Sequence, residues 1–377
     1  MKFSCYLLTT ILSSLGAILF FVLALVYGRI DKPDQTLNNL TFLESNDSTN
    51  SFTESLISRI NSAKSSIKIV SRSLSFSNSS ELDQRFLNAL RSAHERNVYI
   101  LAITSSDDLP DFIECKNVAS HFFMYGITSD LIIFDDIDVL FPGSPLPSLS
   151  TQIGLLFEGA PSVASDANAF VSLGEFLNTS ITEARHFPHS AIVYHNTQSL
   201  HDLGTFGKYS FIQSQGTYYT VPPIREHLEN LINYLSGIRF TKFYIHATRF
   251  IHNLGSYSYY TIQSLLYNIA EQGGDVRILL PESDPNIDLS LKWASTIASH
   301  ENIHIHTMAK QSTNSFIIAD DYFLLGSHPL SDNVLYSSYG LHVLGYNSSM
   351  LPKFNEIFEE DWRESKPFHD LIDRIWN

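Results

Sequence analysis

Two segments of the chain each carry a pair of adjacent aspartates that could take part in acid–base chemistry or metal binding. "SDLIIFDDIDVLFPGS" (129–144) and "TNSFIIADDYFLLGS" (313–327) share one order: polar residues, a mostly apolar run, an Asp-Asp pair, a second apolar run and Gly-Ser. Two neighbouring carboxylates can share a proton or bind a metal ion. Aspartate at the tip of a hairpin also starts or caps the turn. The pattern favours this structural role, and we predict no metal site.

A second candidate group lies just upstream of the later segment. His304 and His306 stand in "NIHIHTMAK", with Lys310 nearby. Residues i and i+2 of a strand share one face, so the two imidazoles could together bind a phosphate or a metal ion weakly. Two histidines on the wet face of a strand are the alternative, and the pattern favours that alternative.

The elements that must position these residues occur twice. "FTESLISRINSAKSSIKIVSRSL" places its apolar residues on one helical face and then alternates as a strand, and "ELDQRFLNALRSAHERN" is a second helix leading into an apolar strand. The same order returns at 224–250 and 262–281. Alternating helices and strands predict an α/β layer fold, and their repetition predicts an internal duplication.

Composition limits the class of protein. The chain has 377 residues with 44% hydrophobic residues, enough for two domains or one duplicated domain with a sizeable core. Its 24 basic and 39 acidic residues give a net charge of −15. Since nucleic-acid binding depends on Lys and Arg neutralising phosphates, nucleic acid is not an expected partner. Anionic membrane surfaces are disfavoured for the same reason.

The amino-terminal region carries a membrane signal. Tyr6 to Tyr27 is an uncharged run of 22 residues, which as a helix spans roughly 33 Å and can cross a bilayer core. The alternative is a cleaved signal peptide with a cleavage site near Val26 and Gly28. Lys2 on one side and Arg29 with Lys32 on the other leave the orientation undecided by charge.

Five sequons all follow this run and favour a lumenal or extracellular body. They predict a type II membrane glycoprotein in the endoplasmic reticulum, in endolysosomes or at the cell surface; chance sequons in a cytoplasmic protein are the alternative. Of the two cysteines, Cys5 borders the membrane helix, and Cys115 is expected to be buried and inert or to form an intermolecular bridge. The sequons begin at Asn39, Asn46, Asn78, Asn178 and Asn347.

These features divide the chain into six parts. They are a cytoplasmic tail (1–5), a transmembrane signal-anchor helix (6–27), a stalk (28–50), a first repeat (51–185), an inter-repeat connection (186–220) and a second repeat (221–377).

The two segments, the duplication and the closing "FNEIFEEDW" (354–362) resemble the phospholipase D superfamily, especially its branch of single-pass type II membrane glycoproteins. The resemblance covers about residues 45–365. It implies a duplicated fold in which two α/β repeats, each a mixed sheet flanked by helices, pack face to face. Each repeat of the family supplies one His-x-Lys-x4-Asp motif, followed by a Gly-Ser-x-Asn element. In that chemistry one His attacks phosphorus, the other is the acid and base, and the lysines hold the phosphate.

Transferred to this sequence, both motifs are degenerate. In the second repeat Asp320 matches the motif Asp, so Thr313 replaces His, Ser315 replaces Lys, and Pro329 stands at the Asn position. In the first repeat, alignment on Gly-Ser makes Asp136 the motif Asp, with Ser129 for His, Leu131 for Lys and Leu146 for Asn. The other register, on Asp135, gives Thr128 and Asp130. None of the fifteen histidines is followed by Lys two residues later.

Loss of a covalent nucleophile and its partners costs on the order of 10⁴–10⁶ in kcat. The resemblance therefore implies a catalytically inactive phospholipase D-like protein with a binding or regulatory role, with no cofactor and no catalytic residue. Homodimerisation or pairing with an active relative would follow from the family. The alternative is a residual phosphodiesterase, acting on phospholipid or single-stranded nucleic acid through His304, His306 or a metal.

Overall fold

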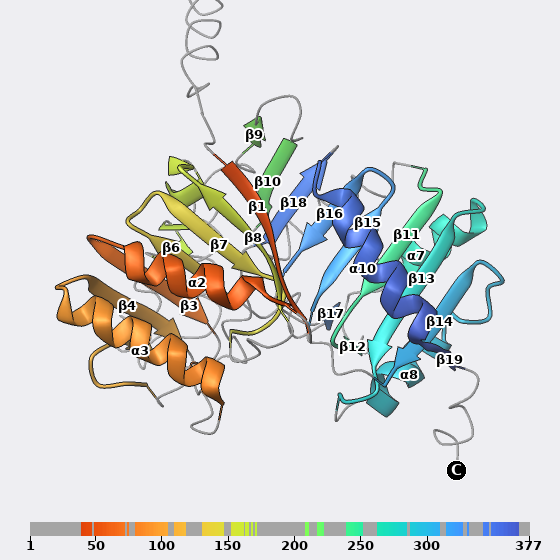
Figure 1. Ribbon diagram of the computed structural model, residues 1–377. Coiled ribbons are helices and arrows are strands. Elements are labelled where there is room, and N and C mark those ends of the chain that lie inside the picture. The colour runs from red at the N-terminus through yellow and green to blue at the C-terminus, as the bar shows by residue number, and fades with distance from the viewer. Residues whose placement is uncertain are drawn as a thin grey trace, which may run out of the picture. The chain divides into compact units, whose positions relative to one another are not determined.

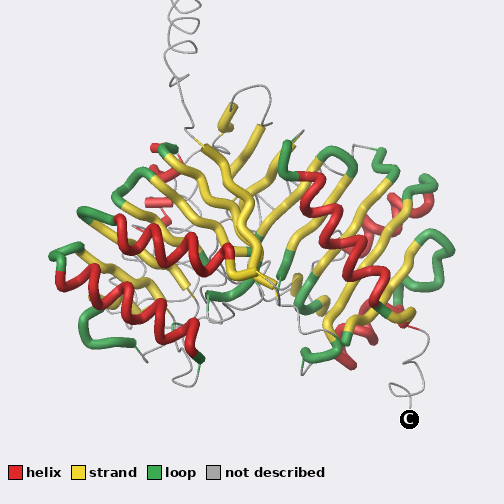
Figure 2. The backbone as a smooth tube through the Cα atoms, viewed as in Figure 1, coloured by secondary structure: helices red, strands yellow, loops and turns green. Residues whose placement is uncertain are grey.

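The computed structural model describes two β-sheets with helices on their faces (Figures 1 and 2). All described residues belong to one compact unit, Leu37–Asn377. They are residues 39–46, 49–71, 74, 80–104, 109–117, 130–146, 152–161, 163–165, 167–168, 170–171, 208–210, 217–221, 239–251, 262–284, 287–309, 314–326, 330–331, 342–346 and 348–368.

The first sheet has eight strands in the order β2-β1-β8-β7-β6-β3-β4-β5. Strands β3, β4 and β5 run parallel to one another. The pairs β3–β6, β6–β7, β7–β8 and β8–β1 are antiparallel. One face is covered by helices α2 and α3, whose apolar residues pack with those of β3 and β6. The bounds are β1 Asn39–Asn46, β2 Thr49–Asn50, α2 Ser51–Ser62, β3 Ser66–Ser71, α3 Glu81–Glu95, β4 Tyr99–Thr104, β5 Glu114–Asn117, β6 Leu131–Phe134, β7 Asp138–Pro142 and β8 Ile153–Glu158.

The second sheet has nine strands in the order β19-β14-β13-β11-β15-β16-β18-β10-β9. Helix α10 packs on one face through Phe354 and Phe358, and helices α7 and α8 pack on the other. The bounds are β9 Lys208–Ser210, β10 Thr217–Val221, β11 Lys242–His246, α7 Ile262–Glu271, β13 Asp275–Pro281, α8 Ile287–Ser295, β14 Ile303–Met308, β15 Phe316–Ala319, β16 Tyr322–Leu325, β18 His342–Tyr346, α10 Leu351–Glu364 and β19 Lys366–Pro367. Strands β12 (Phe250–Ile251) and β17 (Leu330–Ser331) form a separate pair.

The two sheets share one topology. Reading outward, β8-β7-β6-β3-β4-β5 of the first corresponds to β18-β16-β15-β11-β13-β14 of the second, with the same alternation of parallel and antiparallel pairs. The structure therefore has the α/β class with two mixed sheets that the sequence predicted.

Two stretches expected to be connections contribute strands. Part of the expected stalk forms β1, which pairs with β8 over Asn39–Glu44. This strand forms because Leu40 and Leu43 each find an apolar face to bury against. Part of the inter-repeat connection forms β10, which pairs with β18, and β9, which pairs with β10. Polar composition suggested linkers, whereas backbone pairing with a distant strand decided the outcome.

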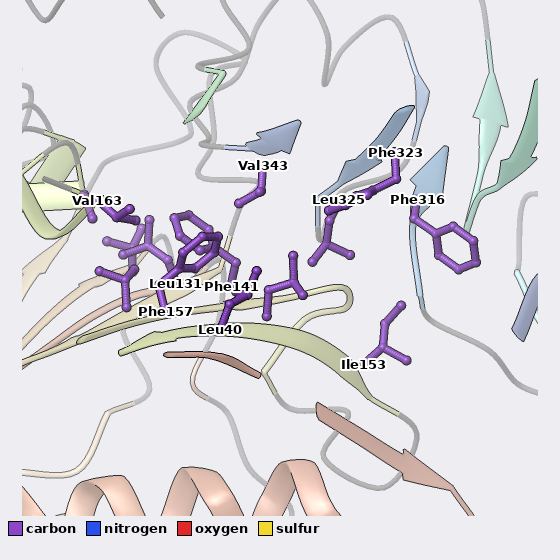
Figure 3. Close-up of a cluster of buried hydrophobic side chains, with 14 of the residues drawn as sticks. Leu40, Leu131, Phe141, Ile153, Phe157, Val163, Phe316, Phe323, Leu325 and Val343 are labelled. Carbon is purple, nitrogen blue, oxygen red and sulfur yellow. The ribbon is translucent and has the colours of Figure 1, made fainter. Parts of the chain in front are cut away.

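One apolar cluster joins residues of both sheets. It includes Leu131 and Phe141 of the first sheet together with Phe316 and Leu325 of the second (Figure 3). Among the described residues, no helix is long and apolar enough to cross a membrane. The predicted span Tyr6–Tyr27 lies outside the described residues.

Candidate functional site

The two acidic hairpins decide which residues are equivalent in the two halves. Asp320 directly follows β15 and has φ of 47°. It donates its N–H to the Lys242 carbonyl and accepts from the N–H and hydroxyl of Thr241. Asp135 directly follows β6, has φ of 52° and makes the same set of bonds with Ser66 and Ser65. The structure therefore matches Asp135 with Asp320, which is the second of the two registers considered from the sequence.

The difference between the registers comes from turn length. In the second half Ala319 pairs with Tyr322, which leaves a two-residue turn. In the first half Phe134 pairs with Asp138, so Asp136 and Ile137 extend the turn to three residues. Asp136 instead accepts hydrogen bonds from Lys68 Nζ at 2.6 Å and Asn168 Nδ2 at 2.9 Å. Gly143 lies eight residues after Asp135, whereas Gly326 lies six residues after Asp320. The added turn residue accounts for one of the two extra positions, so alignment on Gly-Ser does not give the register of the hairpin.

Each hairpin aspartate lies at the opposite end of its strand from the positions that would carry His and Lys. Asp135 follows β6, whereas Asp130 precedes it. Asp320 follows β15, whereas Ser315 precedes it. A four-residue strand spans roughly 13 Å, so neither carboxylate can orient a side chain at the other end. The two aspartates are turn residues in this structure.

The electrostatics of Asp135 agree with a turn role. Partial burial alone would raise its pKa, but hydrogen bonds from the N–H groups of Ser65, Ser66 and Lys64 and from the Ser65 hydroxyl lower the pKa below its usual value. Burial would also raise the pKa of Asp136, but hydrogen bonds from Lys68 and Asn168 lower this pKa below its usual value. Both carboxylates are therefore held ionised by their neighbours, which does not suit a proton-sharing dyad.

With this register, the position before each hairpin strand holds a buried polar residue. Asp130 is 3% exposed and its Oδ2 accepts the N–H of Leu146 at 2.5 Å. Ser315 is 5% exposed, donates its N–H to the Gly143 carbonyl at 2.7 Å, and accepts from the N–H of Gly326. Beside it, Asn314 Oδ1 accepts the N–H of Ile153 at 3.2 Å.

The Ser315–Gly143 and Ile153–Asn314 bonds join the two halves directly. We call this group and its neighbours the junction: Asp130, Gly143, Ser144, Gln152, Ile153, Asn314 and Ser315. The Ser144 hydroxyl and Gln152 Oε1 are buried there without a hydrogen-bond partner in the structure. Leu131, the alternative Lys position, is fully buried in the shared apolar cluster. A carboxylate and a hydroxyl thus stand where the resemblance would place the two lysines, and neither side chain is a cation.

The other sequence candidates lie elsewhere or outside the described residues. His306 Nδ1 lies 2.7 Å from the Ser365 hydroxyl oxygen, and the His306 ring stacks on Trp362, on the face that α10 covers. His304 is 51% exposed, with Nε2 4.0 Å from Asp275. Strand β14 is three places from β15 in the sheet, roughly 14 Å away. Hence neither histidine meets Ser315 at the junction.

No three His, Cys, Asp or Glu side chains converge within the part of the chain that the structure describes. Asn39 and Asn46 are the first and last residues of β1, and Cys115 lies on β5. Seven candidates fall outside the described residues: Thr128, Ser129, Thr313, Pro329, Asn78, Asn178 and Asn347.

One buried group near the junction escaped the sequence analysis. His246 ends β11 with no exposed surface, and its Nε2 lies 3.0 Å from Asp361 Oδ2 while its Nδ1 lies 3.0 Å from the Asn314 carbonyl. A histidine at the end of the apolar run "FYIH" signals a buried group that needs a partner. Its partner Asp361 is 115 residues away, so spacing could not reveal the pair.

Gly143 sets how closely the halves approach. A Cβ at this position would lie 2.7 Å from Ile153 Cγ1 and 3.0 Å from Leu325 Cδ1. We expect Gly143→Ala to lower the free energy of unfolding by about 1–3 kcal/mol through overpacking and to speed hydrogen exchange of the Ser315 amide. Urea unfolding and exchange mass spectrometry measure both. Gly273→Ala, which adds backbone strain at φ of 86° but meets no atom within 4 Å, should leave the Ser315 amide unchanged.

Comparison with known proteins supports the fold. No protein-family profile matches the sequence, and no curated protein matches it. The structure is similar to phosphatidylserine synthase of Haemophilus influenzae Rd KW20, with a TM-score of 0.64, 14% identity and 90% of each chain covered. It is also similar to polyphosphate kinase of Porphyromonas gingivalis, with a TM-score of 0.52, 10% identity, and 90% of this chain against 50% of that chain covered. At these identities the likeness concerns the fold alone: the chain shares the α/β fold of these two proteins.

Proposed function

We propose that this chain is a catalytically inactive phospholipase D-like protein with a binding or regulatory role. The observation that carries the proposal is the pair of residues at the two Lys positions. Asp130 and Ser315 are buried: the Asp130 carboxylate accepts the N–H of Leu146, and the Ser315 backbone is bonded to Gly143 and Gly326. A carboxylate at one of these positions repels a phosphodiester instead of binding it, so both ground-state and transition-state stabilisation of that substrate are lost.

The proposal includes a single-pass type II membrane glycoprotein, with Tyr6–Tyr27 as the anchor and the two sheets in a lumen or outside the cell. The uncharged length of that run and the sequons support this part. Pairing with a second copy or with an active relative is the mode of action that we propose. A shift in mass after peptide N-glycosidase treatment of the full chain from secretory membranes tests the topology.

The catalytic part is tested by hydrolysis assays on the full chain in detergent, with a fluorogenic phosphodiester, a phospholipid and single-stranded DNA. We expect no turnover above buffer, and the same result for His304→Ala/His306→Ala. An active phospholipase D-like enzyme in the same detergent serves as positive control. Turnover by the wild type would overturn the proposal. Turnover that disappears in the double variant would establish the alternative, a phosphodiesterase using the β14 histidines.

A further inference from the structure

Two histidines of β14 stand on one face of the second sheet. Ile303 and Ile305 pack into the apolar cluster that includes α7 and α8, so His304 and His306, which alternate with them, lie on the opposite face, that of α10. The two histidines are two residues apart along the strand, roughly 7 Å. The side chain of His304 is 51% exposed, and the ring of His306 stacks on Trp362. Strand β14 is the neighbour of the edge strand β19 (Figure 1).

The hydrogen bonds of His306 leave one of its nitrogens available. The Ser365 hydroxyl gives its single proton to the Trp362 carbonyl at 2.6 Å, so its oxygen accepts from His306 Nδ1 at 2.7 Å. With the proton on Nδ1, the neutral ring presents a lone pair at Nε2. Within the described residues no hydrogen bond reaches Nε2, and Nε2 is not one of the buried side-chain atoms that lack a partner. Solvent therefore reaches this lone pair.

His304 is placed in a similar way by an acidic neighbour. Asp275 Oδ1 is buried and lacks a hydrogen-bond partner in the described part of the chain, and His304 Nε2 lies 4.0 Å from it. This distance is too long for a hydrogen bond, but the negative charge favours the ring form with its N–H on Nε2. The lone pair of His304 is then on Nδ1. A metal-binding histidine has this arrangement, in which one nitrogen faces an acceptor and the other is free.

The charges around the two histidines permit a cation. Arg277 pairs with His304 in the register of β13 and β14 and would repel a metal ion. However, its guanidinium lies 2.9 Å from Asp275 and 3.3 Å from Glu359, and these two carboxylates offset its charge. No group of three His, Cys, Asp or Glu forms in the described part of the chain. A metal ion here would therefore have two protein ligands and complete its coordination with water.

We propose that His304 and His306 together bind one divalent transition metal ion, through Nδ1 of His304 and Nε2 of His306. Imidazole suits Zn²⁺ and Cu²⁺, whereas Mg²⁺ and Ca²⁺ prefer oxygen ligands. The exposed His304 can turn toward the ion, while Ser365 and Trp362 hold His306 in place. Because His306 is bonded to Ser365, the residue after α10, the ion fixes the end of this helix against β14.

Trp362 provides the readout, because its ring stacks on His306 with centroids 3.8 Å apart and bound Cu²⁺ quenches the fluorescence of an adjacent indole. The full chain in detergent and a non-coordinating buffer is titrated with Cu²⁺. We expect saturable quenching that excess Zn²⁺ reverses. His304→Gln should weaken binding at least about tenfold. Ser365→Ala, which removes the acceptor that orients His306, should weaken it about 10–100-fold.

Two controls separate this site from the other histidines and tryptophans of the chain. His94→Gln, at an exposed position of α3, should leave the affinity unchanged. Trp362→Phe keeps a ring beside His306, so it should retain the bound Cu²⁺, measured by competition with a coloured chelator, and lose the quenching.

The same affinity in the wild type and in His304→Gln would show adventitious binding at other histidines only and would overturn the proposal. Absence of Cu²⁺ binding to the wild type would overturn it as well. The exposed position of His304 makes its variant the decisive one, since this substitution disturbs no buried contact. Metal binding and phosphodiester hydrolysis are measured separately, so the metal site and the proposed function fail or succeed independently.

Discussion

Replacement of Phe354 by alanine should lower the free energy of unfolding by about 3–5 kcal/mol. Phe354 on α10 is fully buried and contacts Phe323 at 4.4 Å and Phe316 at 5.3 Å between ring centroids. It also meets Phe42 of β1 edge to face at 5.2 Å. The substitution opens a cavity between the two sheets, where rigid strands on both sides cannot collapse to fill it. Urea unfolding at constant pH measures the loss.

The matched control is Tyr267→Ala, which removes an aromatic ring that is 41% exposed on α7. It should cost less than about 1 kcal/mol. Phe354→Leu retains most of the buried volume and should cost about 1–2 kcal/mol. A Phe354→Ala variant as stable as the Tyr267→Ala variant would mean that α10 does not hold the sheets together.

The second large effect is expected at the first hairpin. Asp135→Ala should cost about 2–4 kcal/mol, because the N–H groups of Lys64, Ser65 and Ser66 lose their acceptor and alanine disfavours the left-handed backbone at φ of 52°. The site is partly exposed, so water replaces some of the lost bonds. Asp135→Asn keeps an acceptor oxygen and tolerates the same φ, so it should cost less than about 1 kcal/mol.

The pH dependence of stability gives this prediction its sign. The folded pKa of Asp135 is lowered by its hydrogen bonds, so the carboxylate contributes stability above about pH 3.9 and loses it as the pH falls through the folded pKa. Acid titration of the unfolding midpoint should therefore be less steep for Asp135→Asn than for the wild type. Asp136→Ala, whose side chain is 51% exposed, is the neighbouring control and should change stability by less than about 1 kcal/mol. Equal costs for Asp135→Ala and Asp136→Ala would contradict the register assigned to the hairpin.

Together the two predictions distinguish the contacts that hold the two halves together from the contacts that shape a single half. Phe354 contributes through apolar burial between the sheets, whereas Asp135 organises one turn and the start of β3. The junction adds a third contribution, since hydrogen bonds from the Ser315 N–H and to the Asn314 side chain place these two residues against the first half.

The sequence by itself determined the order of helices and strands, the duplication, the two hairpins and their Asp-Asp turns. These are local or repeating features: apolar periodicity, turn residues and the absence of His-x-Lys can be read without knowing which segments meet. The acidic net charge belongs to the same category, because it is a property of residue type alone.

The tertiary structure decided the rest. It showed that Asp135, and not Asp136, is equivalent to Asp320. The first hairpin has one added turn residue, which the strand pairing shows and the sequence pattern does not. It showed that part of the expected stalk forms β1, whose partner strand β8 lies more than 100 residues away along the chain. It also paired His246 with Asp361 across 115 residues. Contacts between distant segments depend on how α10 and the two sheets pack, and no local pattern encodes that packing.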